Sequence, residues 1–261
     1  MKNNLISSKS LFLCILLLGI SNHFVLGQNK NQDYANLVTL FKEWRTFENP
    51  PLRNGAPDYT QKTFEKREAK FKLLKEKLRG IDTIAWPIPQ QVDWHIVHAE
   101  MNGYEFNQRV LRPWERDPAF YKSLWTERSD VPAHEGPTHH GITDLWTYQF
   151  PLDKEGAKKL IADLKIIPAI NEQAKINLTG NAKDLWIAGI RDIIDQSKNL
   201  TTIKDFPGVS KDKNLLITID NAVQSTNDLV DWLQAEAITK TGPSGIGKEE
   251  YTWYLQNVHL V

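Results

Sequence analysis

The chain has 261 residues, of which 41% are hydrophobic and 25% are charged, and its 32 basic side chains balance 32 acidic ones. A neutral chain has no excess positive charge for the phosphates of nucleic acid or for an anionic membrane surface, so neither is expected as a partner. The length and the apolar fraction are sufficient for a large core, which argues against disorder.

The start of the chain has the pattern of a secretory signal peptide. Two lysines precede an apolar run over residues 11–26, and Gly27 offers a small residue for cleavage. Polar residues interrupt this run, which is shorter than the roughly 20 apolar residues of a membrane-spanning helix. We therefore expect residues 1–27 to be removed and residues 28–261 to be exported, to the periplasm or the exterior, with no membrane contact after cleavage. Cys14, the only cysteine, would leave with the leader, so no disulfide or thiolate metal site is expected.

The first apolar stripe beyond the leader predicts an amphipathic helix that ends near Gly80. Asp58 or Thr60 can cap its start, and glycine favours the position just past a helix end. The stripe has spacings of seven, three and four residues and consists of Phe64, Phe71, Leu74 and Leu78.

A second, longer amphipathic helix is expected between the prolines at 87 and 89 and Pro113. Proline is tolerated in the first turn of a helix but cannot continue one further along, so Pro113 is the predicted end. The apolar residues that define this helix keep roughly helical spacing and are Val92, Ile96, Met101, Tyr104 and Leu111.

Residues 113–152 interrupt the helical pattern. Five prolines and the glycines at 136 and 141 break every candidate period over this stretch. We expect a long, Pro-rich excursion that contains one short helix around residues 119–125.

Helices resume after the excursion. Asp153 can cap one, which Pro168 would kink or split, and another is expected over residues 185–194. A longer apolar stripe over residues 216–233 predicts a helix that crosses the domain. No alternating strand pattern of convincing length is present. The expected fold is all-α, an irregular antiparallel multi-helix array within one helical domain over residues 28–261.

The segment HEGPTHH in the excursion raises the question of a metal site. Zinc motifs of the H-E-x-x-H type place two histidines four residues apart on one helix face, beside a glutamate. Here His134 and His139 are five residues apart, and a glycine and a proline between them break the helix. A loop that gathers two imidazoles and Glu135 around one ion stays the alternative. We expect instead a polar loop on the rim of a cleft, to which His140 also contributes.

The stretch GPSGIGKEE at residues 242–250 matches the G-x-x-x-x-G-K pattern of a phosphate-binding loop. The next position should hold a serine or threonine for magnesium, but Glu249 would place negative charge there, and the stretch follows a helix instead of a strand. We expect a connection between helices, with Glu249 and Glu250 in the first turn of the last one, where the dipole favours them. No nucleotide is expected as a ligand.

The nine tryptophans divide by their place in the predicted elements. Those within helical stretches are expected to pack in the core, and they are Trp94, Trp186, Trp232 and Trp253. Trp114, Trp125 and Trp146 lie in or beside the excursion and are the better candidates for lining a groove, although packing is the role that we expect there too. We take Trp125 and Trp146, with the residues of HEGPTHH, as the candidate cleft lining.

Several segments, taken together and in order, resemble the amino-terminal half of the bacterial family called domain of unknown function 885. The segments are LRPWERDPAFY at 111–121, EGPTHHGITDLWTYQFPL at 135–152, LKIIPAINEQAKINL at 164–178 and GIGKEEYTWYLQNVHLV at 245–261. The family is distantly similar to gluzincin-type zinc metallopeptidases. Its presumed zinc motif, His-Glu followed by Pro-Gly-His, lies in the carboxy-terminal half, so the resemblance transfers no catalytic or metal-binding residue to this chain.

The resemblance implies that this chain is the scaffold and one cleft wall of an exported metallopeptidase-like hydrolase. Zinc and a peptide substrate would then belong to the full-length protein, and the chain by itself would be inactive. Because the last apolar helical pattern runs to Val261, the chain is expected to be a fragment of a longer domain. The alternatives are a non-enzymatic helical module that binds peptide or glycan through the excursion, and a truncated product without independent function.

Overall fold

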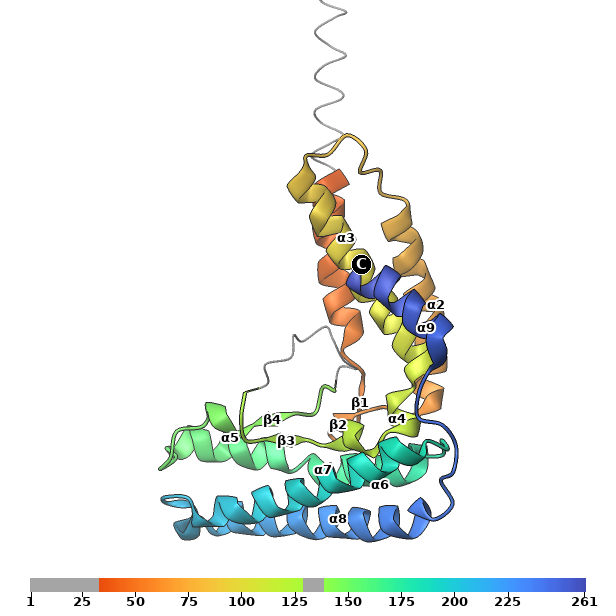
Figure 1. Cartoon of the computed structure of the whole chain (residues 1–261). Helices are drawn as coiled ribbons and strands as arrows, with labels where there is room; N and C mark the ends of the chain where they lie inside the picture. Colours follow the sequence, from red (N-terminus) through yellow and green to blue (C-terminus); the bar gives the residue numbers. More distant parts are fainter. Residues whose placement is uncertain (1–32, 129–138) are drawn as a thin grey trace, which may run out of the picture. The chain divides into compact units, whose positions relative to one another are not determined.

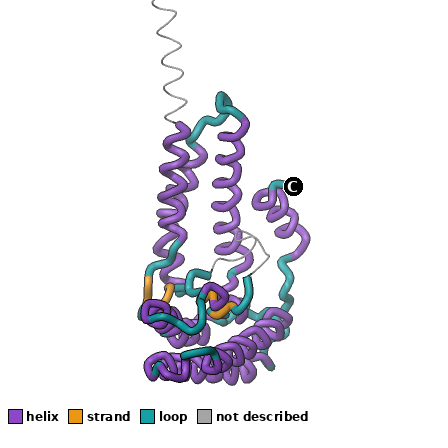
Figure 2. Tube along the Cα trace, turned by 90° about the vertical axis from the view of Figure 1, so that its left-hand side faces the viewer, coloured by secondary structure: helices purple, strands orange, loops and turns teal. Residues whose placement is uncertain are grey.

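The computed structural model describes residues 33–128 and 139–261. Most of these residues are helical, and their strand pairing is limited to two ladders of two residues each. Figure 2 shows this balance, with helices in purple and the short strands in orange. The prediction of an all-α, irregular helical array is confirmed.

The chain divides into two compact units. The first contains the described residues up to Phe47 together with Lys70–His98, and the second contains Glu48–Ala69 and Ala99–Val261. Two helices, α2 (Gln61–Arg79) and α3 (Ile88–Phe106), contribute one half to each unit.

The first unit is built from residues 33–47, the end of α2 and the start of α3. Trp44 is buried and packs on Phe71, with ring centroids 5.9 Å apart. The phenol of Tyr34 donates a 2.7 Å hydrogen bond to Asp93 on α3. The predicted stripe of α2 is confirmed, because Phe71 and the two leucines that follow it in the stripe are all buried.

Helix α3 has the predicted extent, but its predicted apolar stripe is only partly buried. Beyond Phe106 the chain continues as a π-helix, Asn107–Leu111, and ends at Arg112, whose φ of 42° is left-handed. Met101 is fully buried, whereas Val92 and Ile96 are about half exposed. Regular spacing placed these residues along one helix, but it did not determine which of them the neighbouring helices cover.

The second unit contains the remaining α-helices. Helix α7 packs along α8 and helix α6 also packs on α8, as Figure 1 shows. Their bounds are α4 Pro113–Arg116, α5 Lys154–Leu164, α6 Ile167–Asn177, α7 Lys183–Thr202, α8 Lys213–Ala237 and α9 Gly247–Tyr254. The expected helix over residues 185–194 therefore lies in the first two thirds of a longer one, α7.

The starts of α5, α6 and α8 follow from local chemistry. The Asp153 carboxylate accepts a 2.7 Å bond from the N–H of Gly156 and caps α5 as predicted. Asp212 caps α8 by accepting from Asn214 and Leu215. Pro168 lies in the first turn of α6 and splits the helical segment there, because proline lacks the N–H that a helix interior needs.

The connection between α8 and α9 is a loop between helices, as predicted. Helix α9 starts at Gly247, whose φ is 81°, and Glu249 and Glu250 lie in its first turn. Glu250 forms two hydrogen bonds with Arg109, at 2.6 and 2.9 Å. A π-helix, Leu255–His259, continues α9.

The excursion differs from its prediction at residues 119–125. Instead of one short helix, α4 is followed by a 3-10 helix, Pro118–Tyr121, and then by strand β3, Leu124–Trp125. Strand β3 pairs in parallel with β4, Thr143–Asp144. The other ladder joins β1 (Leu52–Arg53) and β2 (Ala56–Pro57). The predicted short helix is wrong for residues 122–125, because contacts from α7 hold the chain extended after Tyr121.

Candidate functional site

Two tryptophans of the excursion are exposed on neighbouring elements of the second unit. Trp125 belongs to β3 and is paired with Asp144 of β4. Trp146 follows in the 3-10 helix Leu145–Thr147. Their exposed fractions are 38% and 45%, whereas their strand neighbours Leu124 and Thr143 are fully buried. We call the surface formed by Trp125, Trp146 and their cations the tryptophan face.

Each indole of the tryptophan face has a cation beside it. The Lys122 ammonium lies 4.6 Å from the ring centroid of Trp125, and the Arg128 guanidinium carbon lies 5.9 Å from that of Trp146. Lys122 also binds Asp192 of α7 at 3.0 Å. Cation–π contacts at exposed sites contribute about 0.5–1 kcal/mol, sufficient to bias the ring orientation. The face therefore combines flat apolar surface with positive charge.

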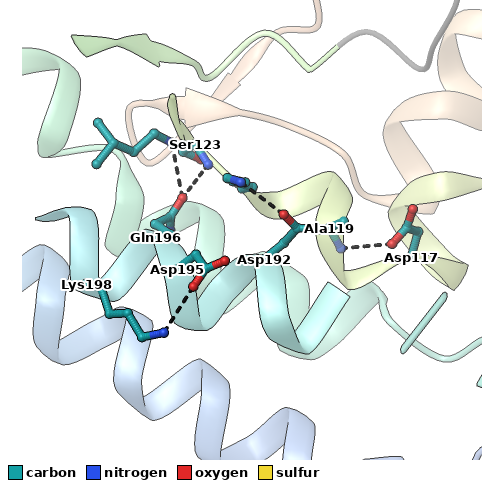
Figure 3. A network of polar contacts seen from close by, with 9 residues as sticks. Asp117, Ala119, Ser123, Asp192, Asp195, Gln196 and Lys198 are labelled. Atoms are coloured by element: carbon teal, nitrogen blue, oxygen red, sulfur yellow. Dashed lines mark hydrogen bonds and ion pairs between the residues drawn. The ribbon is translucent and has the colours of Figure 1, made fainter. Parts of the chain in front are cut away.

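Helix α7 anchors the strand that carries Trp125. The side-chain oxygen of Gln196 accepts hydrogen bonds from the backbone N–H groups of Ser123, at 2.5 Å, and Leu124, at 3.1 Å (Figure 3). Gln196 is fully buried, and its amide nitrogen donates to Thr226 of α8 at 3.4 Å. The side-chain amide of Gln196 thus joins β3, α7 and α8, and it holds β3 in place.

Glycine at position 189 allows the start of the excursion to approach α7. A Cβ atom at Gly189 would lie 2.6 Å from the backbone nitrogen of Ala119 and 2.8 Å from Pro118. Distances this short are not tolerated between a Cβ and a backbone atom. Only glycine therefore permits this packing without a shift of the backbone.

Asp117 lies at the start of the 3-10 helix and has an unusual environment. Its carboxylate accepts a 2.9 Å bond from the N–H of Ala119 (Figure 3). Burial raises the pKa of Asp117 to about 6, and the nearby charge of Asp192 acts in the same direction. The bond from Ala119 and the charge of Arg116 oppose this rise.

The described part of HEGPTHH is packed against aromatic side chains. The His139 ring lies 5.2 Å, between centroids, from both Tyr59 and Phe120. Its Nδ1 accepts from the N–H of Gly141 at 3.1 Å, so the neutral ring carries its proton on Nε2. Burial lowers the pKa of His139 to about 3. The N–H of His140 donates to the Tyr59 hydroxyl at 2.7 Å.

The other two candidate residues of that motif, His134 and Glu135, lie outside the described residues. Within residues 33–128 and 139–261, no three or more His, Cys, Asp or Glu side chains are grouped so that they could hold a metal ion. The expectation that this segment is a polar loop on the rim of a cleft, and not a metal site, stays a prediction. In the same ranges, no helix combines the length and the apolarity that crossing a membrane requires.

Two side-chain amides on α6 hold residues 57–59 and the excursion, and they were not identified from the sequence. Gln173 accepts from the N–H of Tyr59 at 3.0 Å and donates to the carbonyl of Pro57 at 2.9 Å. Asn177 donates to the carbonyl of Tyr59 and to the hydroxyl of Tyr121. Gln173 and its partners are more than 100 residues apart, so no local pattern indicates them.

Comparisons with known proteins give a likeness of fold. No family model matches the chain, and no curated protein matches it. A solved structure, described as a putative lipoprotein of unknown function from Shewanella oneidensis, is similar with a TM-score of 0.56 and 16% identity. The match covers 87% of this chain and 41% of that one, so the chain spans about two fifths of the length of that protein.

Proposed function

We propose that this chain is the scaffold and one wall of the substrate cleft in a longer, exported, metallopeptidase-like hydrolase. The observation that carries the proposal is the exposure of Trp125 and Trp146 on an excursion that Gln196 anchors to α7. An exposed aromatic pair on a fixed backbone loses little conformational entropy on binding, so it suits ligand contact.

The chemistry of the tryptophan face favours a peptide as the ligand. Indole rings contact apolar and aromatic side chains, and Arg128 lies beside Trp146 to meet carboxylates, whereas Lys122 is already paired with Asp192. Zinc and the catalytic groups would belong to the rest of the longer protein, in line with the resemblance to domain of unknown function 885. The match over two fifths of a longer structure is compatible with that arrangement.

Export is supported by the signal-peptide pattern of residues 1–27. The similar structure from Shewanella oneidensis is described as a lipoprotein, a class of exported protein. We propose that the mature chain is exported, to the periplasm or the exterior, where it would meet peptide fragments.

A binding and cleavage experiment with the purified chain tests the proposal. We expect tryptophan fluorescence to change when a library of acidic and aromatic peptides is added, equally with and without a chelator. Trp125→Ala and Trp146→Ala should each weaken binding about fivefold or more, as loss of an aromatic contact predicts. The matched control is Tyr251→Ala, because Tyr251 is 54% exposed outside this face.

Two results would contradict the proposal. Zinc-dependent peptide cleavage by this chain alone would place the active site within it. Binding of a glycan but of no peptide, lost in Trp125→Ala, would assign the chain to a non-enzymatic glycan-binding module.

A further inference from the structure

A carboxylate lies among the exposed apolar side chains of the tryptophan face, on Asp144 of β4. Asp144 is the register partner of Trp125, and paired residues of neighbouring strands project to the same side of a sheet. Ile142 and Trp146, two residues before and after Asp144, are 41% and 45% exposed, whereas the residues directly beside Asp144 in the chain are buried. Asp144 therefore has exposed apolar neighbours both across the ladder and along its own segment.

The side chain of Asp144 has no part in capping a helix, although its position in the chain would allow it. Asp144 directly precedes the 3-10 helix Leu145–Thr147, where an aspartate side chain ordinarily accepts a hydrogen bond from the first turn. The side chains of Asp117, Asp153 and Asp212 all do so at the starts of their helices. The side chain of Asp144 makes no such bond, so the fold does not use this carboxylate as a cap.

The cations of the tryptophan face are engaged elsewhere and leave the Asp144 carboxylate unpaired. The Lys122 ammonium is paired with Asp192 at 3.0 Å, and the Arg128 guanidinium lies over Trp146. Across the part of the chain that the structure describes, no ion pair or side-chain hydrogen bond reaches this carboxylate. A carboxylate and the face of an indole both attract positive charge, so this part of the surface is complementary to a cation.

Arginine is the cationic side chain that fits these surroundings best. Its planar guanidinium can donate two parallel hydrogen bonds to a carboxylate and stack on an indole, and its hydrocarbon stem can cover apolar surface such as Ile142. We propose that Asp144 binds an arginine side chain of the peptide ligand, with the guanidinium beside the indole of Trp125. Lys122 lies over this indole, which is still 38% exposed. The inference rests on the proposed function, because it selects arginine-containing peptides as the ligands of the same face.

Peptides that differ at a single position test the proposal by isothermal titration with the purified chain. The peptides have blocked ends and carry arginine, lysine or citrulline between two phenylalanines. Citrulline has nearly the shape of arginine but no charge. We expect the arginine peptide to bind about tenfold more tightly than the citrulline peptide, with the lysine peptide between them, as an exposed ion pair and a cation–π contact together give. Raising the NaCl concentration from about 0.05 to about 0.5 M should reduce this difference, because salt screens exposed charges.

Asp144→Asn removes the charge of the carboxylate and keeps its size. This variant should bind the arginine peptide about fivefold more weakly than the parent chain does and should bind the citrulline peptide equally well. Asp231→Asn, at an exposed position on α8, is the matched control and should leave both affinities unchanged. Because the Asp144 side chain caps no helix, the midpoint of urea unfolding should be the same for Asp144→Asn and the parent chain.

The outcomes separate the role of Asp144 from the proposed function. If the arginine and citrulline peptides bind equally well and Trp125→Ala weakens both, the role of Asp144 is refuted, whereas the peptide site of the proposed function stands. A preference for arginine that persists in Asp144→Asn would refute that role as well. If none of the three peptides binds, the proposed function is contradicted together with the inference that rests on it.

Discussion

The buried side-chain oxygen of Gln196 accepts a hydrogen bond from the backbone N–H of Ser123, 73 residues earlier in the chain. The same oxygen accepts from Leu124. Because both N–H groups belong to the segment that carries Trp125, this amide links helix packing to the tryptophan face. Changes at Gln196 should therefore affect both stability and ligand contact.

Replacing Gln196 should destabilise the protein and loosen the face. Gln196→Leu leaves two buried N–H groups without their acceptor, which should lower the free energy of unfolding by about 2–4 kcal/mol. Urea unfolding measures this loss, and acrylamide quenching should report greater access to Trp125. Gln224→Leu, at an exposed position on α8, is the control and should change stability by less than about 0.5 kcal/mol.

The close approach at Gly189 predicts a difference between two glycine substitutions. Gly189→Ala should lower the free energy of unfolding by about 1–3 kcal/mol, because the new methyl group meets the backbone of Ala119. Gly103→Ala on α3 meets only Val258, at 3.4 Å, and should gain up to about 1 kcal/mol from helix propensity. Thermal unfolding of both variants measures this difference. Equal effects of the two substitutions would contradict the close packing of Gly189 against Ala119.

The raised pKa of Asp117 predicts a pH dependence of stability. The folded chain binds a proton at Asp117 near pH 6, whereas an unfolded aspartate binds one only near its ordinary pKa of 3.8. This group therefore makes the folded chain more stable as the pH falls from about 7 to about 4, by up to about 3 kcal/mol. Asp117→Asn keeps an oxygen for the N–H of Ala119 and removes the charge.

Unfolding by urea across this pH range tests the role of Asp117. We expect Asp117→Asn to be more stable than the parent chain at pH 7 and about equal to it at pH 4. Asp231→Asn, at an exposed site on α8, is the control. If the free energy of unfolding depends on pH in the same way for Asp117→Asn and for the parent chain, the prediction fails, because the carboxyl group is then solvated.

The lowered pKa of His139 predicts that the stability of the folded chain changes with pH in the opposite direction. The unfolded chain binds a proton at this residue below about pH 6.5, whereas the folded chain does so only near pH 3. The contribution of His139 to stability is therefore full above about pH 6.5 and is lost progressively as the pH falls toward 3. His139→Phe should reduce this loss, although it removes the acceptor for the N–H of Gly141. The free energy of unfolding of both chains, measured at pH 7, 5.5 and 4, gives their pH dependence. The two chains should show the same pH dependence if His139 titrates near its ordinary pKa.

The predicted candidate site was brought together only in part. Trp125 and Trp146 lie on neighbouring elements and are exposed, whereas His139 packs against the rings of Tyr59 and Phe120. A histidine in a polar segment can lie either on an exposed rim or against buried rings. Which of the two it does depends on aromatic residues from distant parts of the chain, and sequence spacing does not reveal those contacts.

The sequence by itself determined most helices of this protein, because caps, prolines and apolar spacing act within a few residues. Asp153 capped α5 and Pro168 started α6 as their local chemistry requires. Only the tertiary structure decided which side of each helix is covered. Val92 and Ile96 share a helix with the buried Met101 yet stay exposed, because burial depends on neighbours that the chain supplies from elsewhere.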